Sequence, residues 1–438
     1  MNRSREYVPG HGDTRYAVRR YDLELVYKVG TNHLSGTATL SVRALEPLRE
    51  LAVDLIGLHA GKVLVNGKPA ARHTHRGGHL VIRLREQRPA GSEFEVRIDY
   101  SGKPKPSPGL HGAAGWEELT DGVLVGSQPY GAPSWFPCND RADDKASYRV
   151  SLTTAEAYHV VGNGDLVARR KRAGSVTWVY EQAEPTSTYL VCVQIGRSTV
   201  TELGPVKAAG AKIPVEIVHP RRVKVGSGTA FARQAQMLTT FADLFGPYPF
   251  GRYRAVITED ELEIPLEAQG MSSFGANHAV AGWENERLVA HELAHQWFGN
   301  SLTAAHWRDI WLHEGFACYS EWLWSQASGG PSTDKHARNH HARLAKLPQD
   351  LLLADPGPKL MFDDRVYKRG ALTLHALRLA MGERDFFDAL RSWTAAKRYG
   401  LVDTAGFLKH LDRAAKGSTP SEVADRWLNQ RKLPELPS

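Results

Sequence analysis

The stretch HELAHQWFGN, residues 291–300, carries two histidines and a glutamate in the order HExxH. His291 and His295 are four residues apart, so on a helix both imidazoles project from one face. Two imidazoles placed in this way can bind one zinc ion, and Glu292 then lies beside a water on that zinc. An amphipathic helix can also carry this short pattern by chance. A third zinc ligand is needed to decide between the two interpretations.

The segment WLHEGFACYSEWLW (311–324) offers a carboxylate for the third position. The 18 residues between His295 and Glu314 are enough to finish one helix, cross a loop and return to the metal. The alternative pattern HExxHxxGxxH does not apply, because its last two fixed positions are Phe298 and Ser301. Three protein ligands leave the fourth position of zinc to water, as in catalytic sites, whereas a structural zinc usually has four protein ligands.

Composition places the chain among globular proteins. Of 438 residues, 42% are hydrophobic and 24% are charged, and the net charge of +7 comes without an aromatic-rich nucleic-acid module. The three cysteines form no CxxC pair, which favours a reducing compartment over a disulfide framework. No apolar run has the length of a signal-peptide core or a membrane span. We therefore expect a cytoplasmic monomer that binds neither nucleic acid nor membranes.

Two patterns divide the chain. Residues 14–205 contain many short segments with alternating apolar and polar residues, and Asn66-Gly67 is a strong hairpin signal. Helical spacing dominates after residue 284. Strands followed by helices predict an N-terminal β-sandwich-like domain at 1–205 and an α+β domain at 206–438 that carries the HExxH motif.

HELAHQWFGN and WLHEGFACYSEWL closely resemble the zinc aminopeptidases related to aminopeptidase N, which belong to the gluzincins. Other segments that share this resemblance follow in order along nearly the whole chain: SQPYGAPSWFPCNDRADDKASYRVSL (127–152), VVGNGDL (160–166), TYLVCVQIG (188–196), FGPYPF (245–250) and VYKRGALTL (366–374). The resemblance implies a saddle-like N-terminal β-domain that contributes to the substrate cleft, a thermolysin-like catalytic domain, and one zinc per chain. It also implies hydrolysis of N-terminal residues from peptides with a free N-terminus.

The resemblance assigns roles to single residues. The implied zinc ligands are His291, His295 and Glu314. Glu292 is the implied general base, and Tyr367 in VYKRG matches the family tyrosine that hydrogen-bonds the developing oxyanion. Asp309 and Glu321 flank the third ligand, where they can orient the histidines as hydrogen-bond acceptors or serve as ordinary helix-surface charges.

The chain departs from the family at the residue that grips the substrate's free α-amine. The family uses the Glu of a GxMEN strand, and this chain has EIPLEAQGMSSF (263–274) instead. Aligning Gly270-Met271 with the motif puts Ser272 at the Glu position, whereas aligning LEA places Glu267 there. We favour Glu267, because a cationic amine near zinc needs a carboxylate partner. Gln128 resembles the β-domain glutamine that also contacts the amine end.

Two other functions compete with an aminopeptidase. A thermolysin-like endopeptidase would use the same zinc and Glu292 but would accept blocked N-termini. A non-catalytic β-rich binding protein with a structural zinc would have four protein ligands. Among the remaining histidines, His336 and His340 repeat the i, i+4 spacing without a neighbouring Glu, so we expect a solvated helix face there. His313, where the family usually has Asn, is expected not to bind the metal.

Overall fold

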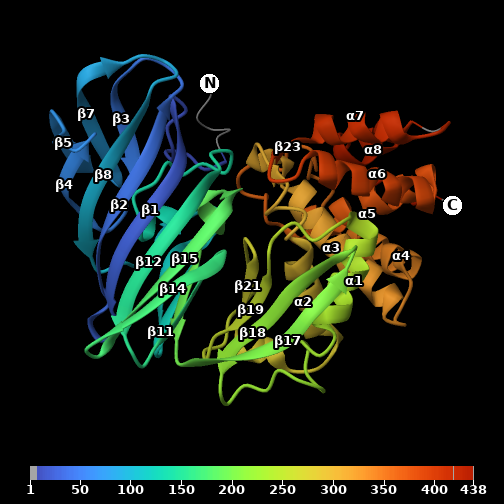
Figure 1. Ribbon diagram of the computed structural model, residues 1–438. Helices are drawn as coiled ribbons and strands as arrows, with labels where there is room; N and C mark the ends of the chain where they lie inside the picture. Colours follow the sequence, from blue (N-terminus) through green and yellow to red (C-terminus); the bar gives the residue numbers. More distant parts are fainter. Residues whose placement is uncertain (1–6, 418, 438) are drawn as a thin grey trace.

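The computed structural model describes residues 7–417 and 419–437. Two bodies lie side by side in Figure 1, one made of strands from the N-terminal half of the chain and the other of a smaller sheet with helices. This order of elements confirms the predicted β-rich domain followed by an α+β domain. Within the described ranges, no helix combines the length and the apolar character needed to cross a membrane.

The largest sheet of the β-domain has eight strands, and alternation of apolar and polar residues builds it. In β1, Tyr21, Leu23 and Leu25 are buried and the residues between them are more exposed, as in a half-buried strand. β1 runs parallel to β12 and antiparallel to β2. In sheet order the strands are β14 (Asp165–Arg172), β15 (Ser175–Thr186), β12 (Ala146–Ala155), β1 (Tyr16–Lys28), β2 (His33–Ala44), β8 (Glu93–Gly102), β4 (His59–Val65) and β5 (Lys68–Pro69).

Two smaller sheets complete the β-domain. One contains β13 (His159–Gly162), β16 (Val193–Gly196), β11 (Gly122–Gly126), β10 (Gly112–Leu119) and β9 (Ser107–Gly109), and the other contains β3 (Leu48–Asp54), β7 (His79–Arg88) and β6 (Arg72–Arg76). Aromatic side chains pack in the shared core, where Tyr21 stacks on Tyr148 with ring centroids 4.9 Å apart. Asn66 and Gly67 join β4 to β5 with φ of 48° and 74°, which confirms the predicted hairpin.

A five-stranded sheet begins the catalytic domain. Its strands, in order, are β17 (Ser198–Ala208), β18 (Ala211–Pro220), β19 (Tyr253–Ile257), β21 (Met271–Phe274) and β20 (Leu266–Ala268). The predicted boundary after residue 205 falls inside β17, which pairs with β18 over its length. Sheet membership changes earlier, between Gly196 and Ser198. The sequence does not mark this change, because strands continue on both sides of it.

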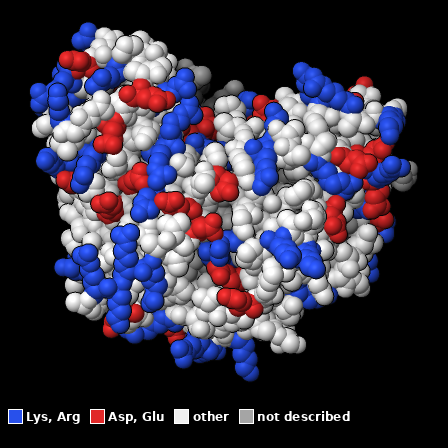
Figure 2. Space-filling model, in the orientation of Figure 1, with Lys and Arg blue, Asp and Glu red and all other residues white. Residues whose placement is uncertain are grey.

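Helices form the rest of the catalytic domain. They are α1 (Gln234–Phe245), α2 (Trp283–Ala294), α3 (Trp311–Ala327), α4 (Thr333–Leu344), α5 (Asp364–Met381), α6 (Glu383–Ala396), α7 (Thr404–Ala414) and α8 (Pro420–Leu428), with the short strands β22 (Thr303–Ala304) and β23 (Leu401–Val402) between them. The described residues also form the short 3-10 helices η2 (Val29–Thr31), η3 (Ala132–Ser134), η4 (Thr188–Leu190), η5 (Ala276–Ala279) and η6 (Trp307–Asp309). On the face shown in Figure 2, basic side chains lie over both domains with acidic ones among them.

Candidate metal centre and active site

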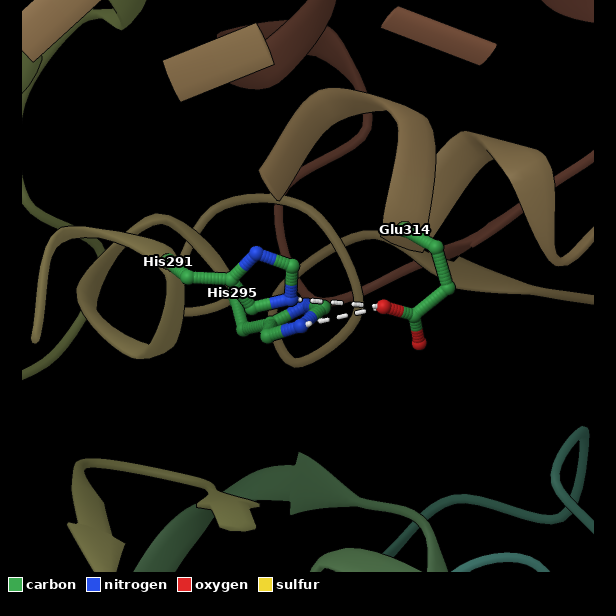
Figure 3. Close-up of side chains that lie close together, drawn as sticks. All are labelled: His291, His295 and Glu314. Carbon is green, nitrogen blue, oxygen red and sulfur yellow. Dashed lines mark ion pairs between the residues drawn. The ribbon is translucent and has the colours of Figure 1, made fainter. Parts of the chain in front are cut away.

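Two helices bring the predicted ligands together. His291 lies in the last turn of α2, His295 caps that helix, and Glu314 lies in the first turn of α3. The Nε2 atoms of both histidines are 3.5 Å from Oε2 of Glu314, and Figure 3 shows the three side chains pointing toward one another. A tetrahedral zinc ion with bonds of about 2.0–2.2 Å separates its ligand atoms by about 3.4 Å. The observed spacing therefore fits one zinc ion.

Hydrogen bonds at the far side of each imidazole fix its orientation. Nδ1 of His291 lies 2.8 Å from Oε1 of Glu321, and Nδ1 of His295 lies 3.0 Å from the carbonyl oxygen of Phe298. A histidine whose Nδ1–H is donated in this way presents an unprotonated Nε2 to a metal. Oε2 of Glu321 is itself 3.3 Å from Nη1 of Arg287.

Asp309 does not orient a histidine, so this part of the prediction is corrected. Its Oδ1 accepts hydrogen bonds from the backbone N–H of Thr404 and, at 2.5 Å, from the Thr404 hydroxyl. The reason lies in the chain path: Asp309 belongs to η6, before α3 begins at Trp311, and it ties that turn to the start of α7. The backbone carbonyl of Phe298 takes the role at His295 instead.

The charges around the ligands favour a cation. Burial alone would lower the pKa of His291, but its hydrogen bonds to Glu314 and Glu321 raise it to about 9. Burial would also lower the pKa of His295, and Glu267 and Glu314 raise it to about 10. The carboxylates around the two imidazoles thus favour positive charge at this point. A divalent cation at the Nε2 atoms supplies that positive charge.

Glu292 projects into the same site without a partner of its own. It is 4% exposed, and its Oε2 has no hydrogen-bond partner among the described residues. Burial raises the pKa of Glu292 to about 8; His291 and His295 act to lower it, and neighbouring carboxylates act to raise it. An oxygen of Glu292 lies within 4.8 Å of ligand atoms of Glu267 and His295. This is the arrangement that a general base beside a metal needs.

The β20–β21 hairpin separates the two candidates for the amine anchor. Glu267 pairs with Ser272 across the hairpin, and Nε2 of Gln128 donates to Oε1 of Glu267 at 2.5 Å. Ser272 is fully buried, and its hydroxyl accepts from Tyr253 and donates to the backbone carbonyl of Glu292. The structure therefore places Glu267 beside the metal-binding residues. The Ser272 side chain instead bonds to the backbone of α2.

A close helix crossing sets the position of Tyr367. A Cβ atom on Gly315 of α3 would lie 2.8 Å from Cα of Gly370 of α5, so the crossing tolerates no side chain at either residue. Three residues before Gly370, the Tyr367 ring lies 6.0 Å from the His291 ring at 19°. Burial and the nearby Glu314 carboxylate raise the pKa of Tyr367 well above 10, so its hydroxyl keeps its proton.

Two family models match the chain in order: the Peptidase M1 N-terminal domain at residues 18–190 and the Peptidase family M1 domain at residues 229–427. A solved structure of the M1 zinc metallopeptidase from Deinococcus radiodurans is 30% identical, with a TM-score of 0.90 over 99% of each chain. The chain belongs to peptidase family M1. A mutant M1 zinc metallopeptidase from that organism, bound to a Tyr-Ser-Ala substrate, has a TM-score of 0.91 at 30% identity over 100% of each chain.

Curated relatives of this M1 chain are longer than it is. Aminopeptidase B of Mus musculus is 24% identical over 91% of this chain and 66% of its own length. Leucyl aminopeptidase of Saccharolobus solfataricus is 24% identical over 95% of this chain and 54% of its own length. The chain therefore spans between about half and two thirds of these relatives. The comparisons confirm the predicted family and fold class, and all of these relatives are peptidases.

His313, His336 and His340 lie outside the groups of side chains that could hold a metal ion in the described part of the chain. Nε2 of His313 accepts a hydrogen bond from the backbone N–H of Ala304 at 2.8 Å, and burial lowers the pKa of His313 to about 3. His336 and His340 do not form the solvated face that the sequence predicted, since both rings stack on Trp322, at 6.1 and 5.1 Å. They belong to none of the groups of potential metal ligands found among the described residues.

Proposed function

We propose that this M1 chain is a zinc-dependent aminopeptidase that removes N-terminal residues from peptides with a free N-terminus. The observation that carries the proposal is the Glu267 carboxylate, which Gln128 holds from the β-domain beside Glu292 and His295. A half-buried carboxylate at this point offers a counter-charge to an α-ammonium group. The peptide bond nearest that group then lies next to the general base.

The residues that would hold zinc are His291, His295 and Glu314. Zinc, when bound, lowers the pKa of a coordinated water from 15.7 to about 7 and polarises the scissile carbonyl. The unpartnered Oε2 of Glu292 accepts a proton from the attacking water and returns it to the leaving amine. Tyr367, whose hydroxyl stays protonated, donates a hydrogen bond to the oxygen that gains negative charge.

The position of Glu267 favours this proposal over the two competing functions. An endopeptidase must let the peptide continue past the active site, whereas here the half-buried Glu267 carboxylate, held by Gln128, offers a partner to a positively charged chain end. A structural zinc site would need a fourth protein ligand. Of the two other nearby carboxylates, Glu267 is held by Gln128, whereas Oε2 of Glu292 has no hydrogen-bond partner among the described residues, which suits a base.

The test compares a matched pair of fluorogenic substrates, one with a free α-amine and one N-acetylated. We expect kcat/KM to be about 10–150-fold higher for the free amine, the range of a charge-assisted hydrogen bond in a partly desolvated site. Equal hydrolysis of both substrates would support the endopeptidase. A protein that binds zinc but hydrolyses neither across a panel of aminoacyl groups would support the structural site.

We also propose that the protein acts as a monomer in a cytoplasmic, reducing environment. Its three cysteines, Cys138, Cys192 and Cys318, are buried and unpaired. Burial raises the pKa of the Cys192 and Cys318 thiols to about 12, which keeps them protonated and unreactive. The molar mass in solution, measured by light scattering, checks the monomer: a value near 48.5 kDa is expected.

A further inference from the structure

Lys145 reaches from the β-domain into the catalytic domain just behind the metal site. It lies at the end of the loop before β12, and its ammonium group donates to the turn that follows α2. The three acceptors are the carbonyl oxygens of Asn300 and Ser301 and the hydroxyl of Thr303, each 3.0 Å away. All three N–H groups of the ammonium are therefore used.

Within the ranges that the structure describes, this ammonium group has no carboxylate partner. Burial is the one cause that lowers the pKa of Lys145, to about 7, and no acidic group opposes it. Lys368, a buried lysine near the site, has Cys318, Glu321 and Asp364 nearby, and its pKa is raised instead. A half-buried cation such as Lys145 that relies on neutral acceptors must hold them in fixed positions, because losing any of them leaves charge without compensation.

The turn that Lys145 holds also carries the acceptor for a metal ligand. It begins at Phe298, whose carbonyl oxygen fixes Nδ1 of His295. The backbone N–H of Asn300 bonds to the carbonyl of His295 at 3.0 Å. A second β-domain residue, Tyr189, donates its hydroxyl to the carbonyl oxygen of Gly299 at 3.4 Å. The β-domain thus fixes the backbone that orients one imidazole.

We propose that Lys145 is a positioning residue for the metal site: by docking the β-domain onto the turn after α2, it holds the Phe298 carbonyl against His295. The inference rests on the proposed zinc site and goes beyond it, because it makes metal retention depend on how the two domains are docked. Any motion that separates Lys145 from Asn300 and Ser301 frees the turn and loosens His295. Domain opening and zinc release are then coupled.

The test is the rate at which zinc leaves the folded protein for a colorimetric chelator. Lys145→Met shortens the side chain by one atom and removes the charge and all three donors. We expect about tenfold faster zinc release, at the lower end of the effect of removing a group that orients a metal ligand. The matched control is Lys171→Met, also in the β-domain, whose exposed ammonium pairs with Glu156 at 2.7 Å. It should release zinc at the wild-type rate.

A purely structural lysine would give a different result. In that case Lys145→Met would unfold at lower temperature but, at a temperature where circular dichroism shows a folded chain, would release zinc as slowly as wild type. That outcome overturns the inference. If Lys145→Met does not fold, Lys145→Gln decides the matter, because its shorter, uncharged side chain offers at most two of the three N–H donors and leaves the hydrogen bonds of Thr303 to the turn in place. We expect zinc release to be two- to fivefold faster in this variant, which is part of the effect of losing all three hydrogen bonds. An unchanged rate of zinc release contradicts the role.

The outcome is distinguishable from a failure of the proposed function. If wild type holds no zinc, or holds zinc without cleaving free-amine substrates, the proposed function fails. If wild type does both and Lys145→Met releases zinc at the same rate, the function stands and only the role of Lys145 fails.

Discussion

Glu292 carries a carboxylate oxygen, Oε2, that is buried and has no hydrogen-bond partner in the described part of the chain. A buried acceptor of this kind costs free energy unless it is used. Catalysis is the use that its position next to His295 and Glu267 supports. The role of Glu292 as a base can therefore be tested separately from zinc binding.

Glu292→Gln should keep zinc and the fold, because the amide has the same size and is not a ligand. It should lose at least about 10²–10⁴ in turnover, because an amide cannot accept the proton. Zinc content and kcat are measured on the same preparation. Glu284→Gln, on the same helix with its side chain 80% exposed, should behave as wild type. Near-normal turnover in Glu292→Gln would assign the base to another residue.

The hydrogen bonds to the Nδ1 atoms of the metal-binding histidines give a second prediction, which compares two variants. Glu321→Gln removes the charge that faces Nδ1 of His291 and should lower zinc affinity about 10–100-fold. Asp309→Asn makes the same chemical change at a residue that bonds Thr404, so it should leave zinc affinity unchanged. Competition with a chelator measures the zinc affinity of both variants. Equal losses in the two variants would mean that general destabilisation, not ligand orientation, is being measured.

The site residues differ in how far sequence could identify them. The spacing of His291, His295 and Glu314 reflects helix geometry and could be recognised directly. The carbonyl of Phe298 could not, because a backbone acceptor leaves no trace in residue type. Asp309 and Glu321 looked equivalent in sequence, and only the path of η6 separates them.

At the scale of elements, the crossing of α3 and α5 joins two motifs whose glycines are 55 positions apart. Gly315 of EGFA and Gly370 of VYKRG meet at the crossing, and this contact explains why both motifs contain glycine. The crossing brings Tyr367 beside His291. Sequence could place each motif on a helix but could not show that the two helices touch.

Gly370→Ala should therefore affect both stability and catalysis. Its Cβ would lie 2.7 Å from Cα of Gly315, which forces the helices apart. Overpacking of this kind costs about 1–3 kcal/mol of unfolding free energy. Displacement of Tyr367 should also lower kcat, toward the loss of about 10²–10³-fold expected for Tyr367→Phe. Denaturant unfolding and kcat are measured together.

Gly251→Ala is the control for this crossing, since a Cβ atom there meets nothing within 4 Å. It should change neither unfolding free energy nor kcat by a measurable amount. Wild-type stability in Gly370→Ala would show that the two helices can separate without cost and would remove the explanation for the paired glycines.

In α4, the prediction from polar residues was wrong. The segment HARNHH (336–341) predicted a solvated helix face, yet His336 and His340 stack on Trp322 of α3. Burial lowers the pKa of His340 to about 4, so the ring is neutral and packs as an aromatic side chain. An imidazole reads as polar in sequence, but its packing depends on a partner that the local pattern does not contain.

At the scale of the whole molecule, the substrate-facing site is shared between the domains. Gln128 comes from the β-domain and Glu267 from the edge strand β20 of the catalytic domain, and their side chains meet at 2.5 Å. The two domains could be predicted from the order of strands and helices, because each strand or helix is recognised from neighbouring residues in the sequence. The contact of Gln128 with Glu267 spans 139 positions and depends on how the domains dock.

The most direct test of the central claim is the ratio of kcat/KM for a free-amine peptide to that for its N-acetylated counterpart, measured in wild type and in Glu267→Gln. Glu263→Gln, an exposed glutamate in the same segment, is the control. We predict that the ratio falls about 10–150-fold in Glu267→Gln and stays at the wild-type value in Glu263→Gln, because only Glu267 faces the substrate amine. An unchanged ratio in Glu267→Gln, together with a collapsed ratio in Ser272→Ala, would contradict the account.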